Sequence, residues 1–183
     1  MRISIKFVVR EFTCTKKNNA LLSIMNKHTH TAPGLEDFKK LLKKHSLKAT
    51  QQRLAVHTAM LKLGHASADM VTEEIRKEGT TNVTVASVYN ILSQIALLGI
   101  YDHRMSANNK MYFDVNTFRH IHLYDYVNNT FKDVIDDDFM DNLDAYFAKK
   151  KYKGYRVECV DVQLVCRPSR SYVKRKPAEE VTD

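Results

Sequence analysis

Apolar residues recur at helical spacing through the first organised part of the chain. The first helix is indicated by apolar positions about one helical turn apart, with lysines on the other faces: Leu35, Phe38, Leu41 and Leu42. The same spacing predicts further helices over residues 50–63, 68–77 and 85–98. Ser67 and Thr84 stand before the last two of these helices, where their hydroxyl groups suit an N-cap. Four helices are therefore expected here.

An alternating pattern follows the last of these helices. Residues 100–105 and 110–115 carry aromatic and apolar side chains on either side of a polar Ser-Ala-Asn-Asn turn, which predicts a β-hairpin. Helices followed by a two-stranded wing form a winged helix-turn-helix, an arrangement that reads DNA. A small α+β domain without a nucleic-acid role is the alternative.

Strands and one helix are expected in the second half of the chain. The pattern predicts strands over residues 120–127, 131–135 and 155–166, and a helix over 139–150. The Asn128-Asn129 pair predicts a two-residue turn, which would set Asp133 opposite Tyr124. The exposed edges of such a unit favour pairing with a second copy of the chain.

The predicted fold class is α+β, a winged helix-turn-helix domain followed by a small α/β dimerisation domain. We expect a flexible N-terminal extension (1–34), the DNA-binding domain (35–115), the metal-binding dimerisation domain (116–167) and a disordered tail (168–183). Met25 is an alternative start, because the organised pattern begins after it.

Charge narrows the class of partner. The 183 residues carry a formal net charge of +8, which favours a polyanion but does not choose between nucleic acid and a membrane surface. Charged residues interrupt every apolar stretch before the roughly 18 residues that a membrane-spanning helix needs. The three cysteines form no CxxC motif, which argues against a disulfide framework or a zinc ribbon and favours the cytoplasm.

The fourth predicted helix carries the features of a DNA-reading element. Its apolar stripe would dock on the domain: Val85, Val88, Ile91, Leu92 and Ile95. Its other face is small, polar and uncharged: Ala86, Tyr89, Asn90, Ser93 and Gln94. Tyr89 suits contact with a thymine methyl group and Asn90 suits adenine, although Tyr89 also fits a stacking or core role.

Phosphate contacts are expected from the start of the second helix. The candidate residues are Lys48, Thr50, Gln52 and Arg53. The lysines of the first helix would add to this attraction, and a solvated face is the alternative for them.

His120 and His122 lie two residues apart in a predicted strand, so both imidazoles point to one face. Asp133, on the next strand, would share that face. Two imidazoles and a carboxylate suit a divalent Zn, Fe or Mn ion. A strand surface without any metal is the alternative. An iron oxygenase or metallohydrolase built on the same three residues is a further alternative, but no HExxH motif or phosphate-cradling glycine loop supports it.

Several runs together resemble the ferric uptake regulator superfamily. The runs are Leu47–Arg53, His65–Asp69, Val83–Asn90, Phe113-Asp114, His120-Ile121-His122 and Asp133. The resemblance is greatest with the peroxide-responsive branch, and it implies one regulatory ion between the two domains, held by five residues: His65, Asp114, His120, His122 and Asp133. It further implies a homodimeric, metal-dependent repressor, not an enzyme, that reads A·T-rich operators. Ser87 joins the implied DNA-contacting residues.

The sequence also departs from that family. Family members hold a structural zinc with two CxxC pairs, whereas Asp125 and Asn128 replace the first pair and Cys166 stands without a second cysteine. We therefore expect no structural four-cysteine zinc, and we expect Asp125 to face Lys132 across the hairpin. Val160 and Met140 replace ligands of a second site in the iron-responsive branch. Haem is an alternative signal, with these candidate ligands: Cys159, Cys166, His28 and His30.

Overall fold

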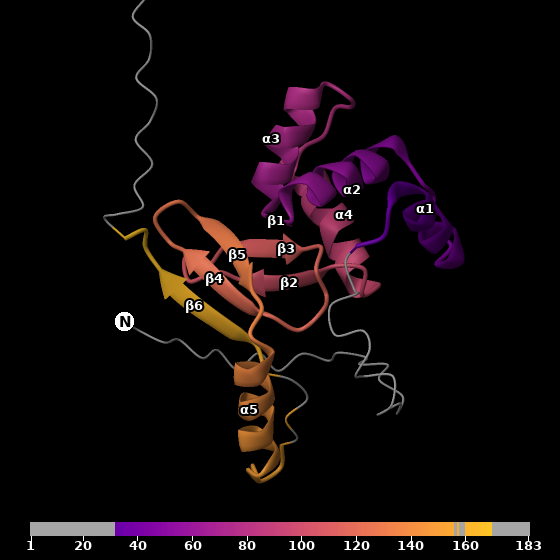
Figure 1. Cartoon of the computed structure of the whole chain (residues 1–183). Helices are drawn as coiled ribbons and strands as arrows, with labels where there is room; N and C mark the ends of the chain where they lie inside the picture. The colour runs from indigo at the N-terminus through magenta and orange to yellow at the C-terminus, as the bar shows by residue number, and fades with distance from the viewer. Residues whose placement is uncertain (1–31, 156, 158–159, 170–183) are drawn as a thin grey trace, which may run out of the picture.

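The computed structural model describes residues 32–155, 157 and 160–169. Four helices and a small sheet make up the winged-helix half, and a second sheet with one projecting helix makes up the other (Figure 1). The helices are α1 (Leu35–Lys44), α2 (Gln51–Leu63), α3 (Ala68–Glu78), α4 (Val85–Leu97) and α5 (Asp137–Ala148). The strands are β1 (His65–Ala66), β2 (Asp102–Met105), β3 (Met111–Asp114), β4 (Ile121–Asp125), β5 (Thr130–Val134) and β6 (Val162–Cys166).

The four predicted helices of the winged-helix half are confirmed, and their apolar faces build one core. Phe38, Val56, Ile75 and Leu92, one from each helix, are all fully buried in it. Thr84 caps α4 through reciprocal hydrogen bonds with Ser87. No helix among the described residues is long and apolar enough to cross a membrane.

Two local expectations in this half are wrong. Ser67 stands at the N-cap of α3, but its hydroxyl accepts no capping hydrogen bond and is buried without a partner. Val85 was expected in the buried stripe of α4, yet it is the first residue of that helix and is 39% exposed.

The wing is a three-stranded sheet in the order β1-β3-β2. The predicted β2–β3 hairpin is confirmed, and the two-residue strand β1 adds to its other edge. This pairing sets His65 directly opposite Asp114. A short strand between two helices therefore brings a histidine to the end of the wing.

The second sheet has the order β5-β4-β6, with β6 parallel to β4. The predicted two-residue turn is wrong: the loop spans residues 126–129, and Asp133 lies opposite His122 instead of Tyr124. The last strand is also shorter than expected, covering Val162–Cys166. The loop length differs from the prediction by two residues, so Asp133 still shares the histidine face.

The expected pair between Asp125 and Lys132 is also wrong. Asp125 lies opposite Thr130, and its carboxylate contacts the loop that follows β4. It accepts hydrogen bonds from the Val127 backbone N–H, at 2.9 Å, and from Nδ2 of Asn128, at 2.6 Å. Hydrogen bonds therefore close the turn at the positions where the resemblance would have placed two zinc-binding cysteines.

Candidate metal centre and nucleic-acid interface

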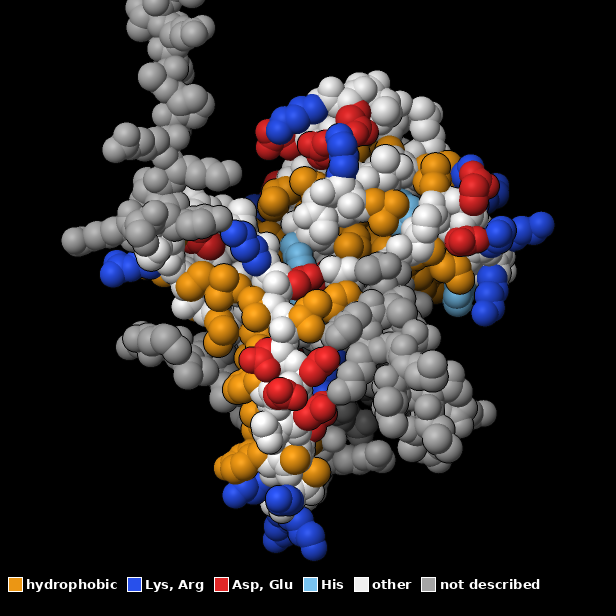
Figure 2. Space-filling model, viewed as in Figure 1, with side chains coloured by type: hydrophobic (Ala, Val, Ile, Leu, Met, Phe, Trp, Pro, Cys, Tyr) orange, Lys and Arg blue, Asp and Glu red, His pale blue; other side chains and the backbone are white. Residues whose placement is uncertain are grey.

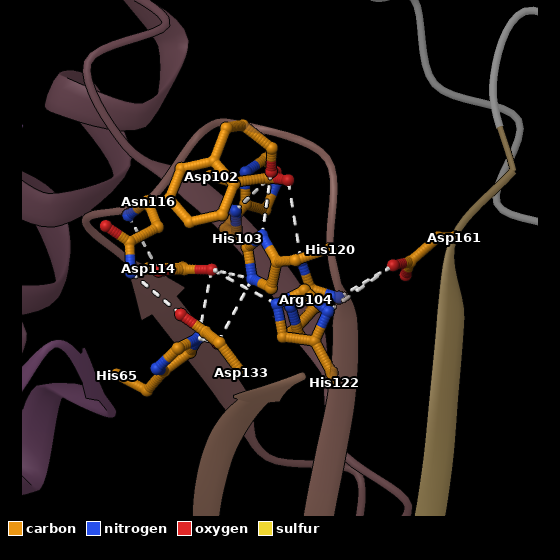
Figure 3. Close-up of polar contacts among 11 residues, drawn as sticks. His65, Asp102, His103, Arg104, Asp114, Asn116, His120, His122, Asp133 and Asp161 are labelled. Atoms are coloured by element: carbon orange, nitrogen blue, oxygen red, sulfur yellow. Dashed lines mark hydrogen bonds and ion pairs between the residues drawn. The ribbon is translucent and has the colours of Figure 1, made fainter. Parts of the chain in front are cut away.

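Three histidines and two aspartates meet where the wing faces the second sheet (Figure 3). One donor atom from each of the five lies within 4.8 Å of all the others, and the set is His65, Asp114, His120, His122 and Asp133. His65 comes from β1 and Asp114 from the end of β3, whereas His122 and Asp133 come from the paired strands β4 and β5. The structure thus brings together all five residues named from the sequence.

Two carboxylate oxygens stand at the centre of this cluster. Oδ2 of Asp114 lies 2.9 Å from Nε2 of His65, 3.3 Å from Nε2 of His120 and 3.1 Å from Nε2 of His122. Oδ1 of Asp133 lies 3.0 Å from Nε2 of His65 and 3.1 Å from Nε2 of His120. Donors bound to one ion at about 2.1 Å stand roughly 3 Å apart, so this spacing matches a shared ion.

The buried polar atoms of the cluster also fit a metal ion. Nε2 of His65, Nε2 of His120 and Oδ1 of Asp133 are buried without a hydrogen-bond partner. Buried polar atoms in native proteins are almost always satisfied, so three in one place need a common explanation. A divalent ion bonded to all three supplies one, and three nitrogens with two oxygens form a donor set that suits Fe, Mn or Zn.

Proton binding in the metal-free cluster follows from its charges. Burial lowers the pKa of His120, but the contacts with Asp114 and Asp133 outweigh burial and raise it to about 9. Burial, aided by the positive charge of Arg104, lowers the pKa of His122 to about 4, although its contact with Asp114 opposes this change. Burial opposes ionisation of Asp114 and Asp133, yet the histidines hold the pKa of both carboxyls well below the usual range. The same two aspartates also raise the pKa of His65 against the effect of burial. Without an ion, the cluster therefore favours protons on His120 and His65, the two imidazoles that contact both carboxylates.

Contacts of the other ring nitrogen, Nδ1, orient the imidazoles of His120 and His122. Nδ1 of His120 lies 2.7 Å from the carbonyl oxygen of Phe118, which places the proton on Nδ1 and leaves Nε2 as the lone-pair donor. Nδ1 of His122 faces Oδ1 of Asp161 at 3.8 Å, and Arg104, buried in the wing, holds that oxygen at 2.7 Å.

Sequence reasoning missed three polar residues around the cluster: Asn116, Arg104 and Asp161. Asn116 hydrogen-bonds to both aspartates, while Arg104 and Asp161 tie strand β2 to the residue before β6. Asn116 could have been noticed because it follows Asp114 by two residues, whereas Arg104 and Asp161 carry no motif and lie far in the sequence from the named ligands.

The predicted DNA-reading residues lie on the outer side of α4. Tyr89 is 43% exposed and packs edge-on against Phe113 of the wing, with ring centroids 6.0 Å apart. Asn90 is exposed beside it. A hollow of about 600 Å³ separates this part of α4 from the wing tip at Lys110. Ser87 instead donates its hydroxyl to the Thr84 carbonyl as part of the helix cap.

The predicted phosphate contacts cluster at the start of α2, where some also support the fold. Arg53 donates to the Lys48 carbonyl, at 2.7 Å, and to the Gln94 side chain of α4, at 2.9 Å. Gln52 donates to the Asn82 carbonyl and Thr50 caps α2, while Lys48 is exposed. Figure 2 shows acidic side chains gathered over the start of α5, a surface that would repel the phosphates of DNA.

Helices α1–α4 with their wing, and a metal-ligand cluster against a second small sheet, define a winged-helix protein of the metalloregulator class. A family model described as "Ferric uptake regulator family" matches residues 44–165. The chain belongs to this family, which is one of transcription regulators and not of enzymes. A search of curated proteins found no match.

Solved structures share the fold at low sequence identity. The ferric uptake regulator of Vibrio cholerae is 21% identical with a TM-score of 0.63, over 72% of this chain and 100% of that one. The Helicobacter pylori regulator, whose structure "reveals three functional metal binding sites", is 18% identical with a TM-score of 0.61, over 75% and 93%. The Campylobacter jejuni peroxide stress regulator is 25% identical with a TM-score of 0.50, over 72% and 96%.

Proposed function

We propose that this protein is a metal-dependent repressor that binds A·T-rich operator DNA as a homodimer in the cytoplasm and controls peroxide-stress or iron-homeostasis genes. The observation that carries the proposal is the origin of the five donors. His65 and Asp114 belong to the winged-helix half, and the other three belong to the second half. A single cluster therefore spans the junction between the DNA-binding and dimerisation domains.

This location explains how metal binding would control DNA binding. The bound ion would supply the positive charge that keeps two carboxylates and three imidazoles together at the junction. Only the arrangement of domains that unites the donors has high affinity for the ion, so loading shifts the population toward it. In a dimer, the same arrangement fixes the distance between the two α4 helices, which must match two half-sites on the DNA.

The donor set supports one Fe²⁺, Mn²⁺ or Zn²⁺ per chain. Haem, the alternative signal, has weaker support: among the described candidates, burial raises the pKa of the Cys166 thiol and so disfavours the thiolate. Cys159, His28 and His30 lie outside the described residues. Peroxide sensing is favoured over a pure iron signal by the all-His/Asp donor set and by the likeness to a peroxide stress regulator.

The test compares His120→Ala with His45→Ala, a control that removes an exposed histidine far from the cluster. Operator DNA is selected from random sequence with Mn²⁺-loaded protein, and affinity is then measured by fluorescence anisotropy with and without metal. We expect His120→Ala to lose tight metal binding and metal-dependent DNA affinity while His45→Ala keeps both. Metal-dependent operator binding by His120→Ala would refute the assignment. Loss of operator affinity after peroxide with Fe²⁺, but not with Mn²⁺, would identify the signal.

A further inference from the structure

Asn116 stands in the segment between β3 and β4, where the chain passes from one domain to the other. Its backbone N–H donates to Oδ1 of Asp114 at 2.8 Å. Its side-chain Nδ2 donates to Oδ2 of Asp133, also at 2.8 Å. One residue therefore binds both acidic members of the cluster, and these two aspartates come from different halves of the molecule (Figure 3).

In each of the two carboxylates, one oxygen accepts a hydrogen bond from Asn116 and the other faces the histidines. Asn116 takes Oδ1 of Asp114 and Oδ2 of Asp133, which are the oxygens that do not face the histidines. The remaining oxygens, Oδ2 of Asp114 and Oδ1 of Asp133, lie within 3.3 Å of histidine nitrogens. Oδ1 of Asp133 is buried without any hydrogen-bond partner.

We propose that Asn116 is a positioning residue that makes each aspartate a single-oxygen ligand of the regulatory ion. The inference rests on the proposed metal site. A carboxylate whose second oxygen already accepts a hydrogen bond cannot turn both oxygens to an ion without losing that bond. The cluster then offers three nitrogens and two oxygens, and both carboxylates are held in place before the ion arrives.

The two aspartates should respond differently to substitution. The backbone N–H of Asn116 holds Asp114 whatever side chain position 116 carries. The side chain is needed only for Asp133, so Asn116→Ala frees Asp133 to rotate away or to present both oxygens. Asn116→Asp keeps the size of the side chain but sets a third carboxylate against Asp133, which should be at least as harmful.

The experiment uses Co²⁺ as the probe, because its visible d–d absorption reports the number and type of donors. The full-length protein is titrated with Co²⁺ and Mn²⁺ as wild type, Asn116→Ala, Asn116→Asp and Asn108→Ala. Asn108→Ala is the matched control: its Nδ2 donates to Oδ1 of Asn129 at 3.0 Å, also across the two halves, but touches no ligand. Circular dichroism verifies that each variant is folded.

We expect both Asn116 variants to bind Mn²⁺ about 10-fold or more weakly, as when other residues that orient metal ligands are removed. Their Co²⁺ spectra should also change in intensity and position, while Asn108→Ala matches wild type in both measurements. An unchanged spectrum and affinity in a folded Asn116 variant would overturn this inference and leave the metal site standing. A wild type that binds neither ion would overturn the proposed function and this inference with it.

Discussion

The two halves of the molecule are held together in different ways. Among the described residues, the winged-helix half has a core cluster of 19 buried residues, whereas the cluster under the second sheet has three. One of those three, Tyr112, belongs to the wing and packs on Phe131 with ring centroids 4.9 Å apart. The second sheet thus rests on the wing and on the metal-ligand cluster beside it.

The difference shows where stability and switching reside. The large core should let the winged-helix half fold without metal, since about 25 cal/mol is gained per Å² of apolar surface buried. The second half leaves apolar side chains exposed on β5, the residue after it and α5: Val134, Ile135, Phe139 and Tyr146. Apolar side chains exposed in this number favour association, and a second copy of the chain is the partner that we propose. We therefore propose that the half with the smaller core carries dimerisation and supplies three of the five metal ligands.

The largest expected effect comes from truncating a buried side chain in the core of the winged-helix half. Leu92→Ala removes a fully buried side chain of α4 and should lower the free energy of unfolding by about 2–5 kcal/mol, with metal affinity unchanged below the melting transition. Phe131→Ala should behave differently, because Phe131 stacks on His65 and so supports the cluster. We expect it to weaken Mn²⁺ binding as well as stability. Urea denaturation and Mn²⁺ titration of both variants measure these effects. Weaker Mn²⁺ binding by Leu92→Ala, with Phe131→Ala unchanged, would contradict this difference between the two halves.

The pH dependence of metal binding is expected to be nearly as large. The pKa of His120 is about 9 in the metal-free protein, so binding at pH 7 must release its proton. Affinity should rise about tenfold or more per pH unit from pH 7 to 9, because the proton on His120 is displaced and His65 also has a raised pKa, and then level off. A free imidazole would instead give a plateau above about pH 6.5. Titrations in buffers of different ionisation enthalpy count the released proton.

The raised pKa of His120 also determines how the stability of the metal-free protein changes with pH. The folded-state pKa of His120 lies above the unfolded value, so its contacts with Asp114 and Asp133 stabilise the metal-free protein fully only below about pH 6.5. That contribution is lost as pH rises through about 9. The gain in melting temperature on adding metal should therefore widen between pH 7 and 9, and a gain that narrows would contradict the assigned protonation.

Much of this organisation was predictable because it depends on local pattern. The helices follow from apolar spacing, and the histidine face of β4 follows from strand alternation. The predicted loop was two residues too short, because hydrogen bonds from Val127 and Asn128 to Asp125 close a longer turn that no dipeptide rule describes. Asp133 stayed on the correct face because strand side chains repeat every two residues.

Other parts of the site were hidden because they depend on long-range pairing. The edge-to-edge pairing of β1 with β3 aligns His65 with Asp114, but a two-residue strand leaves no periodic signal. Asn116 and Arg104 act through residues that are distant in the sequence or lie in another domain. The role of each residue depends on the atom that its side chain contacts, and only the folded structure shows which atom that is.

A smaller effect is expected on DNA binding, where substitution of Tyr89 should change sequence discrimination and substitution of Lys48 should change affinity for all DNA. Tyr89→Ala removes an exposed ring at the wing side of α4, and it should cost about 1–3 kcal/mol of discrimination between operator and random DNA. Lys48→Ala should weaken binding to all sequences alike and make the salt slope shallower by about one. Anisotropy titrations at several salt concentrations measure both. Equal loss on every sequence in Tyr89→Ala would remove it from the reading face.

The smallest expected effect is that of metal removal on the dimer. The turn at 125–128 is closed by hydrogen bonds from Asn128 to Asp125, and backbone hydrogen bonds pair β4 with both β5 and β6. We therefore expect the dimer to survive strong chelation and thiol alkylation, even though operator affinity falls. Analytical ultracentrifugation with elemental analysis, before and after chelation, measures this directly. Dissociation to monomers together with zinc release would reveal a structural metal and show that the second half depends on metal for its assembly as well as its response.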